Sequence, residues 1–180
     1  MLIGLCGAAG AGKDTVAGLL EDARGPRIQR IAFADPLYKA VAAITGLTVE
    51  KLQDRVVKEA VIPWLGKSPR HLLQTLGTEW GRGMVRQDIW VCIALERARA
   101  VLDRGDSVVI TDVRFDNEAQ AILEAGGEVW KVIRPGWKCL ADDAEKHASE
   151  AGVDDRFVSR IVVNDGTVDA LRNQLETATI

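Results

Sequence analysis

The sequence predicts an α/β protein with three layers and a five-stranded parallel sheet. Short apolar runs typical of buried strands alternate with helical patterns at least five times along the chain. The first strand breaks into a glycine-rich turn, and ligands of open α/β sheets bind beyond such strand ends. The 180 residues, 47% of them hydrophobic, suit one domain with a sizeable core.

The first strand, residues 2–6, runs into the sequence GAAGAGKDT at residues 7–15. Glycines allow backbone N–H groups to turn inward around an anion, and a helix beginning near Gly12 adds its positive dipole end. Lys13 supplies a charge for the β- and γ-phosphates. The turn therefore predicts a mononucleotide site for ATP. The residues expected to contact ATP here are Ala9, Gly10, Ala11, Gly12, Lys13, Asp14 and Thr15.

The turn fits the P-loop pattern G-x-x-x-x-G-K-[ST] except at Asp14, which stands where a hydroxyl residue normally binds Mg²⁺. Either Thr15 supplies a hydroxyl one residue later, or Asp14 reaches the metal through water. A carboxylate beside a triphosphate repels it unless Mg²⁺ or an arginine intervenes. The sequence leaves both options open.

The segments that follow alternate between helix and strand. A helix after the turn ends at Gly25, and residues 28–33 form the second strand. Asp35 then begins a helix, either as its N-cap or as a substrate contact. Residues 37–60 are predicted as two helices joined near Gly46, with charges typical of a solvated face.

A further helix is predicted from its cap at Ser68 to its stop at Gly77. Residues 77–83 combine three glycines with an aromatic, an acidic and a basic side chain, and we expect a loop that can close over a ligand. Arg70 and Arg82 can hold an anionic group from two sides, because a guanidinium binds phosphate in a bidentate manner.

The second half of the chain places an acid at a strand end. Residues 88–102 predict a long helix, and residues 107–112 predict a buried parallel strand that ends in Asp112. This is a Walker-B-like arrangement, and its end should face the same crevice as the P-loop. Asp112 is therefore expected to help place Mg²⁺ or its waters, and Arg114 points from the same crevice.

The remaining elements complete the alternating pattern. Asp116 or Asn117 is expected to cap a helix, whose dipole explains Glu118 in its first turn. Residues 128–134 and 159–163 predict the last two strands. Between them lies a polar stretch that is either a lid or an ordinary solvated helix.

Composition excludes several kinds of partner. The net charge of −3 argues against a broad nucleic-acid-binding face, so the ligands should be small. Three cysteines without a C-x-x-C pair fit a reducing cytoplasm, and no apolar run approaches the length that spans a bilayer. The two histidines lack zinc spacing. Amphipathic helices leave the oligomeric state open, with a homodimer as one option.

Together these motifs resemble the phage-type deoxynucleoside monophosphate kinases, within the wider P-loop kinase family that includes adenylate kinase and dephospho-CoA kinase. The resemblance covers nearly the whole chain. It rests on GAAGAGKDT (7–15), FADPL (33–37), Arg70 with LQ (73–74) and GTE (77–79), ITDVRFDNE (110–118), HASE (147–150) and NDGT (164–167).

This resemblance implies a single P-loop kinase domain over residues 1–180, with a helical monophosphate-binding region near 36–85 and a lid near 135–152. Asn164 and Asp165 match a loop that lies against the adenine of ATP. The residues expected at the acceptor nucleotide are Asp35, Lys39, Arg70, Gln74, Glu79, Trp80, Arg114, Glu118 and Trp137. Those expected to act in catalysis are Lys13, Arg70, Asp112, Arg114 and Arg134, and those expected to hold Mg²⁺, directly or through water, are Asp14, Thr15 and Asp112.

The expected reaction is phosphorylation of a deoxynucleoside monophosphate by Mg-ATP, in the cytoplasm of the host if the protein is phage-encoded. The acceptor phosphate attacks the γ-phosphorus in line and needs no general base, because it is already ionised. Two alternatives remain. The first is a kinase for another acceptor, such as dephospho-CoA or phosphomevalonate. The second is a switch that binds ATP without transferring phosphate, but the surplus of arginines argues against it, because a switch has no second anion to hold. Selectivity for deoxyribose could come from Asp35, Trp80 or Tyr38.

Overall fold

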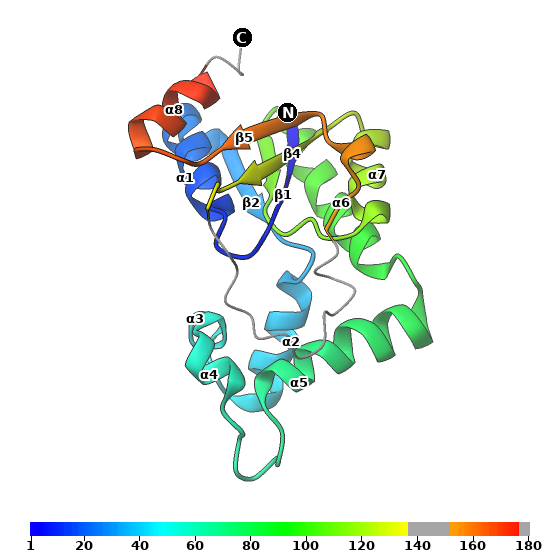
Figure 1. The fold of residues 1–180 in the computed structure, drawn as a ribbon. Helices are drawn as coiled ribbons and strands as arrows, with labels where there is room; N and C mark the ends of the chain where they lie inside the picture. The colour runs from blue at the N-terminus through cyan, green and yellow to red at the C-terminus, as the bar shows by residue number, and fades with distance from the viewer. Residues whose placement is uncertain (137–151, 177–180) are drawn as a thin grey trace. The chain divides into compact units, whose positions relative to one another are not determined.

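The computed structural model describes residues 1–136 and 152–176 (Figure 1). Most of the predicted lid lies outside these residues, and so do Trp137 and the HASE segment at 147–150. Predictions that fall on them are therefore not addressed by the structure.

A five-stranded sheet forms the centre of the fold, with the strand order β2-β3-β1-β4-β5 and every neighbouring pair parallel (Figure 1). The middle strand β1 pairs with β3, where Ile3 lies opposite Val109, and with β4, where Leu5 lies opposite Trp130. The predicted parallel sheet is confirmed. The strands are β1 (Leu2–Cys6), β2 (Ile28–Ile31), β3 (Ser107–Ile110), β4 (Glu128–Ile133) and β5 (Arg160–Val163).

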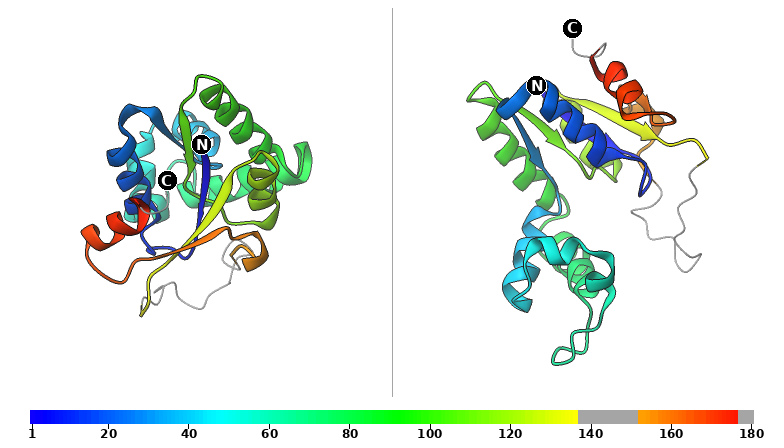
Figure 2. Two further views of the ribbon diagram at one scale, coloured as in Figure 1. Left: turned by 90° about the horizontal axis from the view of Figure 1, so that it is seen from above. Right: turned by 90° about the vertical axis from the view of Figure 1, so that its left-hand side faces the viewer.

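Helices cover both faces of this sheet, which confirms the three layers. Helices α1 (Lys13–Arg24) and α8 (Val168–Glu176) lie on one face, and α7 (Asp116–Glu124) lies on the other with the later turns of α6 (Ile89–Leu102) (Figures 1 and 2). The short 3-10 helices η1 (Gly25–Arg27) and η4 (Asp155–Phe157) precede β2 and β5. The core under α1 and α8 is mostly aliphatic, with Trp130 as an aromatic member, and its aliphatic residues include Ile3, Leu5, Val16, Leu20, Leu171 and Leu175.

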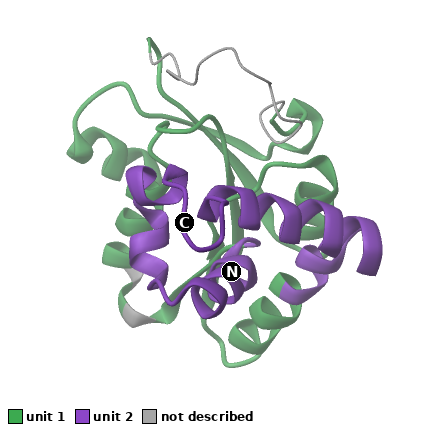
Figure 3. Ribbon diagram, turned by 90° about the horizontal axis from the view of Figure 1, so that it is seen from below, with its two compact units in different colours: residues 1–32, 94–180 green, residues 33–93 purple. Residues whose placement is uncertain are grey.

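The chain divides into two compact units (Figure 3). Unit 1 is Met1–Ala32 with Ala94–Ile180 and contains the sheet, and unit 2 is Phe33–Ile93. Unit 2 includes the predicted helical region of residues 36–85. That both units belong to a single domain stays a prediction.

Unit 2 is helical, with α2 (Asp35–Thr45), α3 (Val49–Gln53), α4 (Arg55–Glu59), α5 (Pro69–Gln74) and the π-helical segment η2 (Thr75–Val85). The prediction of two helices over 37–60 is wrong, because the Asp54 carboxylate accepts a hydrogen bond from the Val57 N–H at 3.0 Å and starts a third helix. Asp35 is not an N-cap either: α2 begins at Asp35, after Ala34.

The loop predicted at residues 77–83 is wrong, because these residues lie within η2. Two of its glycines contact the buried Trp90 in different ways. The Trp90 Nε1 donates to the Gly77 carbonyl at 2.8 Å, and a Cβ added to Gly81 would lie 2.3 Å from the Trp90 ring. At Gly81 a glycine is needed because an indole packs against the helix, and not because the chain turns, whereas a Cβ on Gly77 would meet the Leu37 side chain at 3.1 Å.

This packing predicts different effects for two glycines of the same helix. Gly81→Ala should lower the free energy of unfolding by about 1–3 kcal/mol, because its methyl group meets the Trp90 ring. Gly83→Ala is the matched control: its added Cβ would lie 3.5 Å from the Thr78 carbonyl oxygen, and alanine favours the helix by up to ~1 kcal/mol. Urea titrations followed by circular dichroism measure both, and equal stability of the two variants would contradict the packing.

Candidate active site

The turn after β1 has the backbone shape of a phosphate loop. Gly7 and Gly12 adopt φ values of 130° and 102°, which other residues rarely adopt. A Cβ on Gly7 would also lie 2.2 Å from the Val132 carbonyl oxygen, so the site excludes any side chain. Gly12 is the N-cap of α1, and the loop therefore ends at the positive end of a helix.

Lys13 closes this loop. Its Nζ donates to the carbonyl oxygens of Gly7 at 2.7 Å and Ala8 at 2.9 Å, so the side chain reaches back across the turn. A bound triphosphate would offer the ammonium group phosphate oxygens in place of these carbonyls.

Four of the predicted charged residues share one electrostatic environment in unit 1. The pKa of Lys13 is lowered, first because burial disfavours the charged ammonium and next because Arg114 repels it. The carboxylates of Asp14 and Asp112 act in the opposite direction. The loop lysine, the arginine and both carboxylates therefore lie close enough to interact, and their shared role in catalysis stays a prediction.

The donor atoms present fit Mg²⁺. Asp112 is half-buried just beyond β3, and Asp14 and Thr15 are exposed in the first turn of α1. Among residues 1–136 and 152–176, no group of three or more His, Cys, Asp or Glu side chains is arranged to hold a metal ion. Mg²⁺ needs no such group, because it is usually bound by one or two carboxylates together with phosphate oxygens and water.

Arg114 follows β3, close enough to Lys13 to contribute to the lowered pKa of that lysine. Arg114 is exposed, whereas Glu118 is buried, and the Glu118 carboxylate accepts hydrogen bonds from the backbone N–H groups of Arg114 and Phe115. The predicted cap at Asp116 or Asn117 is wrong, since α7 begins at Asp116 and Phe115 is its N-cap.

Asn164 contacts the phosphate loop from the end of β5. Its Nδ2 donates to the Ala11 carbonyl oxygen at 2.9 Å, and its backbone N–H donates to the Ile133 carbonyl oxygen at 2.8 Å. Sequence reasoning missed this contact, because 153 residues separate the partners. Asp165 is exposed beside Asn164, and its expected contact with ATP stays a prediction. Arg134 is exposed after β4, and its expected role in catalysis stays a prediction as well.

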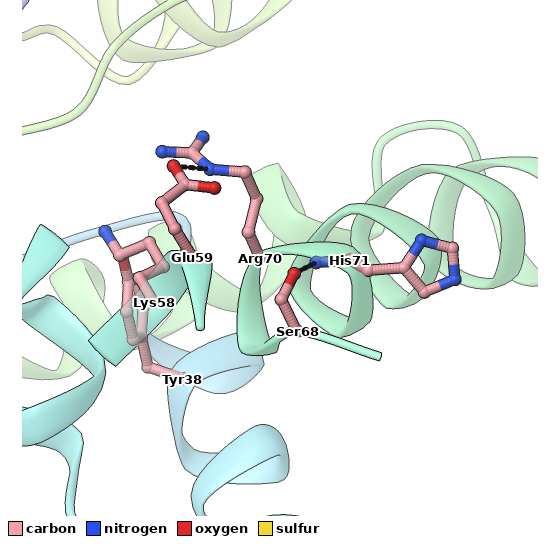
Figure 4. A network of polar contacts seen from close by, with 6 residues as sticks. All are labelled: Tyr38, Lys58, Glu59, Ser68, Arg70 and His71. Atoms are coloured by element: carbon pink, nitrogen blue, oxygen red, sulfur yellow. Dashed lines mark hydrogen bonds and ion pairs between the residues drawn. The ribbon is translucent and has the colours of Figure 1, made fainter. Parts of the chain in front are cut away.

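Unit 2 places Arg70 beside an acid (Figure 4). The Arg70 Nε donates to the Glu59 Oε1 at 2.5 Å, and the side chains are 46% and 47% exposed. Nearby, the Lys58 Nζ donates to the Tyr38 hydroxyl at 2.8 Å. The Ser68 Oγ accepts from the His71 N–H at 3.3 Å, which confirms the predicted cap of α5.

The other residues predicted at the acceptor are spread over α2, α5 and η2. Asp35 is half-buried at the start of α2, and Trp80 is 47% exposed with its ring centroid 6.4 Å from that of Trp90. The prediction that Arg70 and Arg82 hold one anion from two sides relied on a loop at 77–83. That loop is absent, because α5 continues directly into η2. The remaining predicted residues are exposed: Lys39, Gln74 and Glu79.

The model of the deoxynucleotide monophosphate kinase family matches residues 42–175. This chain belongs to the deoxynucleotide monophosphate kinase family. A protein of Acanthamoeba polyphaga mimivirus that bears this family's name is 30% identical over 202 residues, covering 97% of this chain and 94% of the relative. The deoxynucleoside-5'-monophosphate kinase of Escherichia phage T5 is 29% identical over 227 residues, covering 91% and 89%. The resemblance predicted from the motifs is confirmed.

Solved structures of two other kinases share the fold of this family member. The dephospho-CoA kinase of Campylobacter jejuni superposes with a TM-score of 0.53 at 14% identity, over 98% of this chain and 94% of that one. The shikimate kinase of Aquifex aeolicus vf5 superposes with a TM-score of 0.50 at 12% identity, over 99% and 95%. The predicted P-loop kinase fold is confirmed.

In the described part of the chain, no helix is both long and apolar enough to cross a bilayer. The predictions of no nucleic-acid partner, a cytoplasmic location and a homodimer as one option stay predictions.

The contact between Asn164 and the loop predicts how Asn164→Ala changes ligand binding. Loss of the hydrogen bond to the buried Ala11 should loosen the phosphate cradle and raise the dissociation constant for ATP about tenfold. Binding of inorganic tripolyphosphate, which has no adenine, should be weakened by a similar factor. Calorimetric titration of both ligands measures this, with the exposed Asn117→Ala as control. Weakened ATP binding with unchanged tripolyphosphate binding would instead indicate a contact with adenine.

Proposed function

We propose that this kinase transfers the γ-phosphate of ATP to the phosphate of a deoxynucleoside monophosphate and releases ADP and the deoxynucleoside diphosphate. The observation that carries the proposal is the glycine loop closed by Lys13 at the start of α1, in a member of this family. That loop suits the triphosphate of the donor, and the names of the relatives suggest the acceptor.

The chemistry follows from the charges of the two reactants. An oxygen of the acceptor phosphate forms a bond to the γ-phosphorus, while the bond from that phosphorus to the β-phosphate oxygen breaks and its electron pair leaves with ADP. Both reactants are anions, so the protein must suppress their repulsion and exclude water. In this proposal Lys13, Arg114 and Arg134 of unit 1 and Arg70 of unit 2 supply the positive charge.

Mg²⁺ would be held by Asp112 together with Asp14 or Thr15, directly or through water. When bound, it neutralises charge on the β- and γ-phosphates. The protein's own residues orient the triphosphate: the loop amides and Lys13 fix the phosphates, and Asn164 holds the loop.

We assign the acceptor phosphate to Arg70, whose guanidinium matches a phosphate geometrically. Its ion pair with Glu59 holds the side chain near α4, and the exposure of both groups leaves them accessible to a ligand. The remaining residues proposed to contact the base or sugar are Asp35, Lys39, Gln74, Glu79 and Trp80.

The acceptor is tested by an assay of ADP release with Mg-ATP against dTMP, dGMP, dCMP, dAMP and their ribose forms. We expect turnover with at least one deoxynucleotide. Dephospho-CoA is the matched control, because a kinase for that acceptor shares the fold. Turnover with dephospho-CoA but with none of the deoxynucleotides would contradict the proposal. Absence of turnover with every acceptor tested would contradict it as well.

Arg114 and Lys13 should differ in what they contribute. Arg114→Ala should lower kcat about 10³- to 10⁵-fold, the range for an arginine that stabilises the transition state, while the dissociation constant of ATP changes little. Lys13→Ala should weaken both ATP binding and turnover.

Arg99→Ala is the control for these variants, since it removes an exposed arginine of α6 that pairs with Glu96 at 3.7 Å. Steady-state kinetics and ATP titration of the three variants give the comparison. Near-normal turnover by Arg114→Ala would remove the role proposed for this residue.

A further inference from the structure

Glu118 is a buried acid close to the proposed catalytic residues. Within residues 1–136 and 152–176, Ser107 and Glu118 are the polar residues found buried, and Glu118 is only 2% exposed. A carboxylate in such a place is unfavourable unless hydrogen bonds or charges compensate it. Its burial therefore calls for a structural explanation, which its partners provide.

The partners of Glu118 are backbone donors. Its Oε2 accepts from the Arg114 N–H at 2.8 Å and from the Phe115 N–H at 3.1 Å. Glu118 lies in the first turn of α7, where the helix dipole also favours a negative charge. Hydrogen bonds to a charged acceptor are stronger than those between neutral groups.

These bonds complete the anchoring of the segment between β3 and α7. The Thr111 N–H donates to the Ile31 carbonyl oxygen of β2, and the Val113 N–H donates to the Leu5 carbonyl oxygen of β1, both at 3.1 Å. The two strands therefore hold the first half of the segment, and Glu118 holds the second half. The Val113 side chain is buried as well, which leaves the exposed Arg114 side chain on a fixed backbone.

We infer that Glu118 is a positioning residue, which fixes the backbone from which the Arg114 guanidinium reaches the transferred phosphate. It acts through Arg114 and does not contact the acceptor, which replaces the substrate contact expected from the resemblance. The inference rests on the proposed function, because it takes Arg114 as a catalytic residue.

A double-mutant cycle with Glu118→Ala and Arg114→Ala tests this role. A displaced arginine costs turnover, and a shift of about 1 Å can cost up to 10²-fold. In the otherwise wild-type enzyme, Glu118→Ala should therefore lower kcat about 10- to 100-fold with little change in the KM for ATP. In the Arg114→Ala background it should have no further effect on kcat.

Two further variants keep the test decisive. Glu118→Gln has a side chain of the same length that retains an oxygen acceptor, so its kcat should be higher than that of Glu118→Ala. If Glu118→Ala does not fold, Glu118→Gln replaces it in the cycle. Glu124→Ala removes an exposed acid of the same helix, whose carboxylate accepts from the Gln120 side chain, and should leave kcat unchanged.

The outcomes separate the inference from the proposed function. If Arg114→Ala impairs turnover and Glu118→Ala lowers kcat by the same factor in both backgrounds, Glu118 only supports the fold and the positioning role is overturned. If Arg114→Ala has near-normal turnover, the catalytic role of Arg114 itself fails. Loss of the Glu118 effect in the Arg114→Ala background confirms the inference.

Discussion

The backbone of the phosphate loop has to turn where no side chain fits, and unit 1 is arranged around that turn. The loop begins at Gly7, against the carbonyl of Val132 in β4, and ends at Gly12, against the side chain of Asn164 after β5. Strands β4 and β5 pair in parallel, so one edge of the sheet holds both ends of the loop. These two strands therefore constrain the positions of both ends of the cradle.

The same sheet edge also carries positive charge on a fixed backbone. Strand β1 leads into the phosphate loop and also accepts the hydrogen bond from Val113, while Glu118 anchors the two residues that follow. Lys13 and Arg114 repel one another in this site, which contributes to the lowered pKa of Lys13. In the proposed reaction, bound anionic substrates would relieve that repulsion, which suits transfer between two phosphates.

Local patterns predicted most of the fold but not its long-range contacts. Apolar runs and the glycine-lysine turn identified the strands and the phosphate loop, because these signals lie within a few residues. The glycines at 77–83 predict a loop from their local sequence, which does not reveal that Gly81 accommodates the Trp90 ring within a helix. The contacts of Asn164 with the loop and the burial of Glu118 likewise depend on partners brought together by folding.

Direct transfer of phosphate is the central claim, and ATP labelled at the γ-phosphate tests it most directly. The wild-type enzyme is mixed with labelled Mg-ATP and each deoxynucleoside monophosphate under single-turnover conditions, and the products are separated. The account predicts label in the β-phosphate of a deoxynucleoside diphosphate, with loss of that product in Lys13→Ala. Label released only as inorganic phosphate, or retained in ATP with every deoxynucleotide, would contradict it.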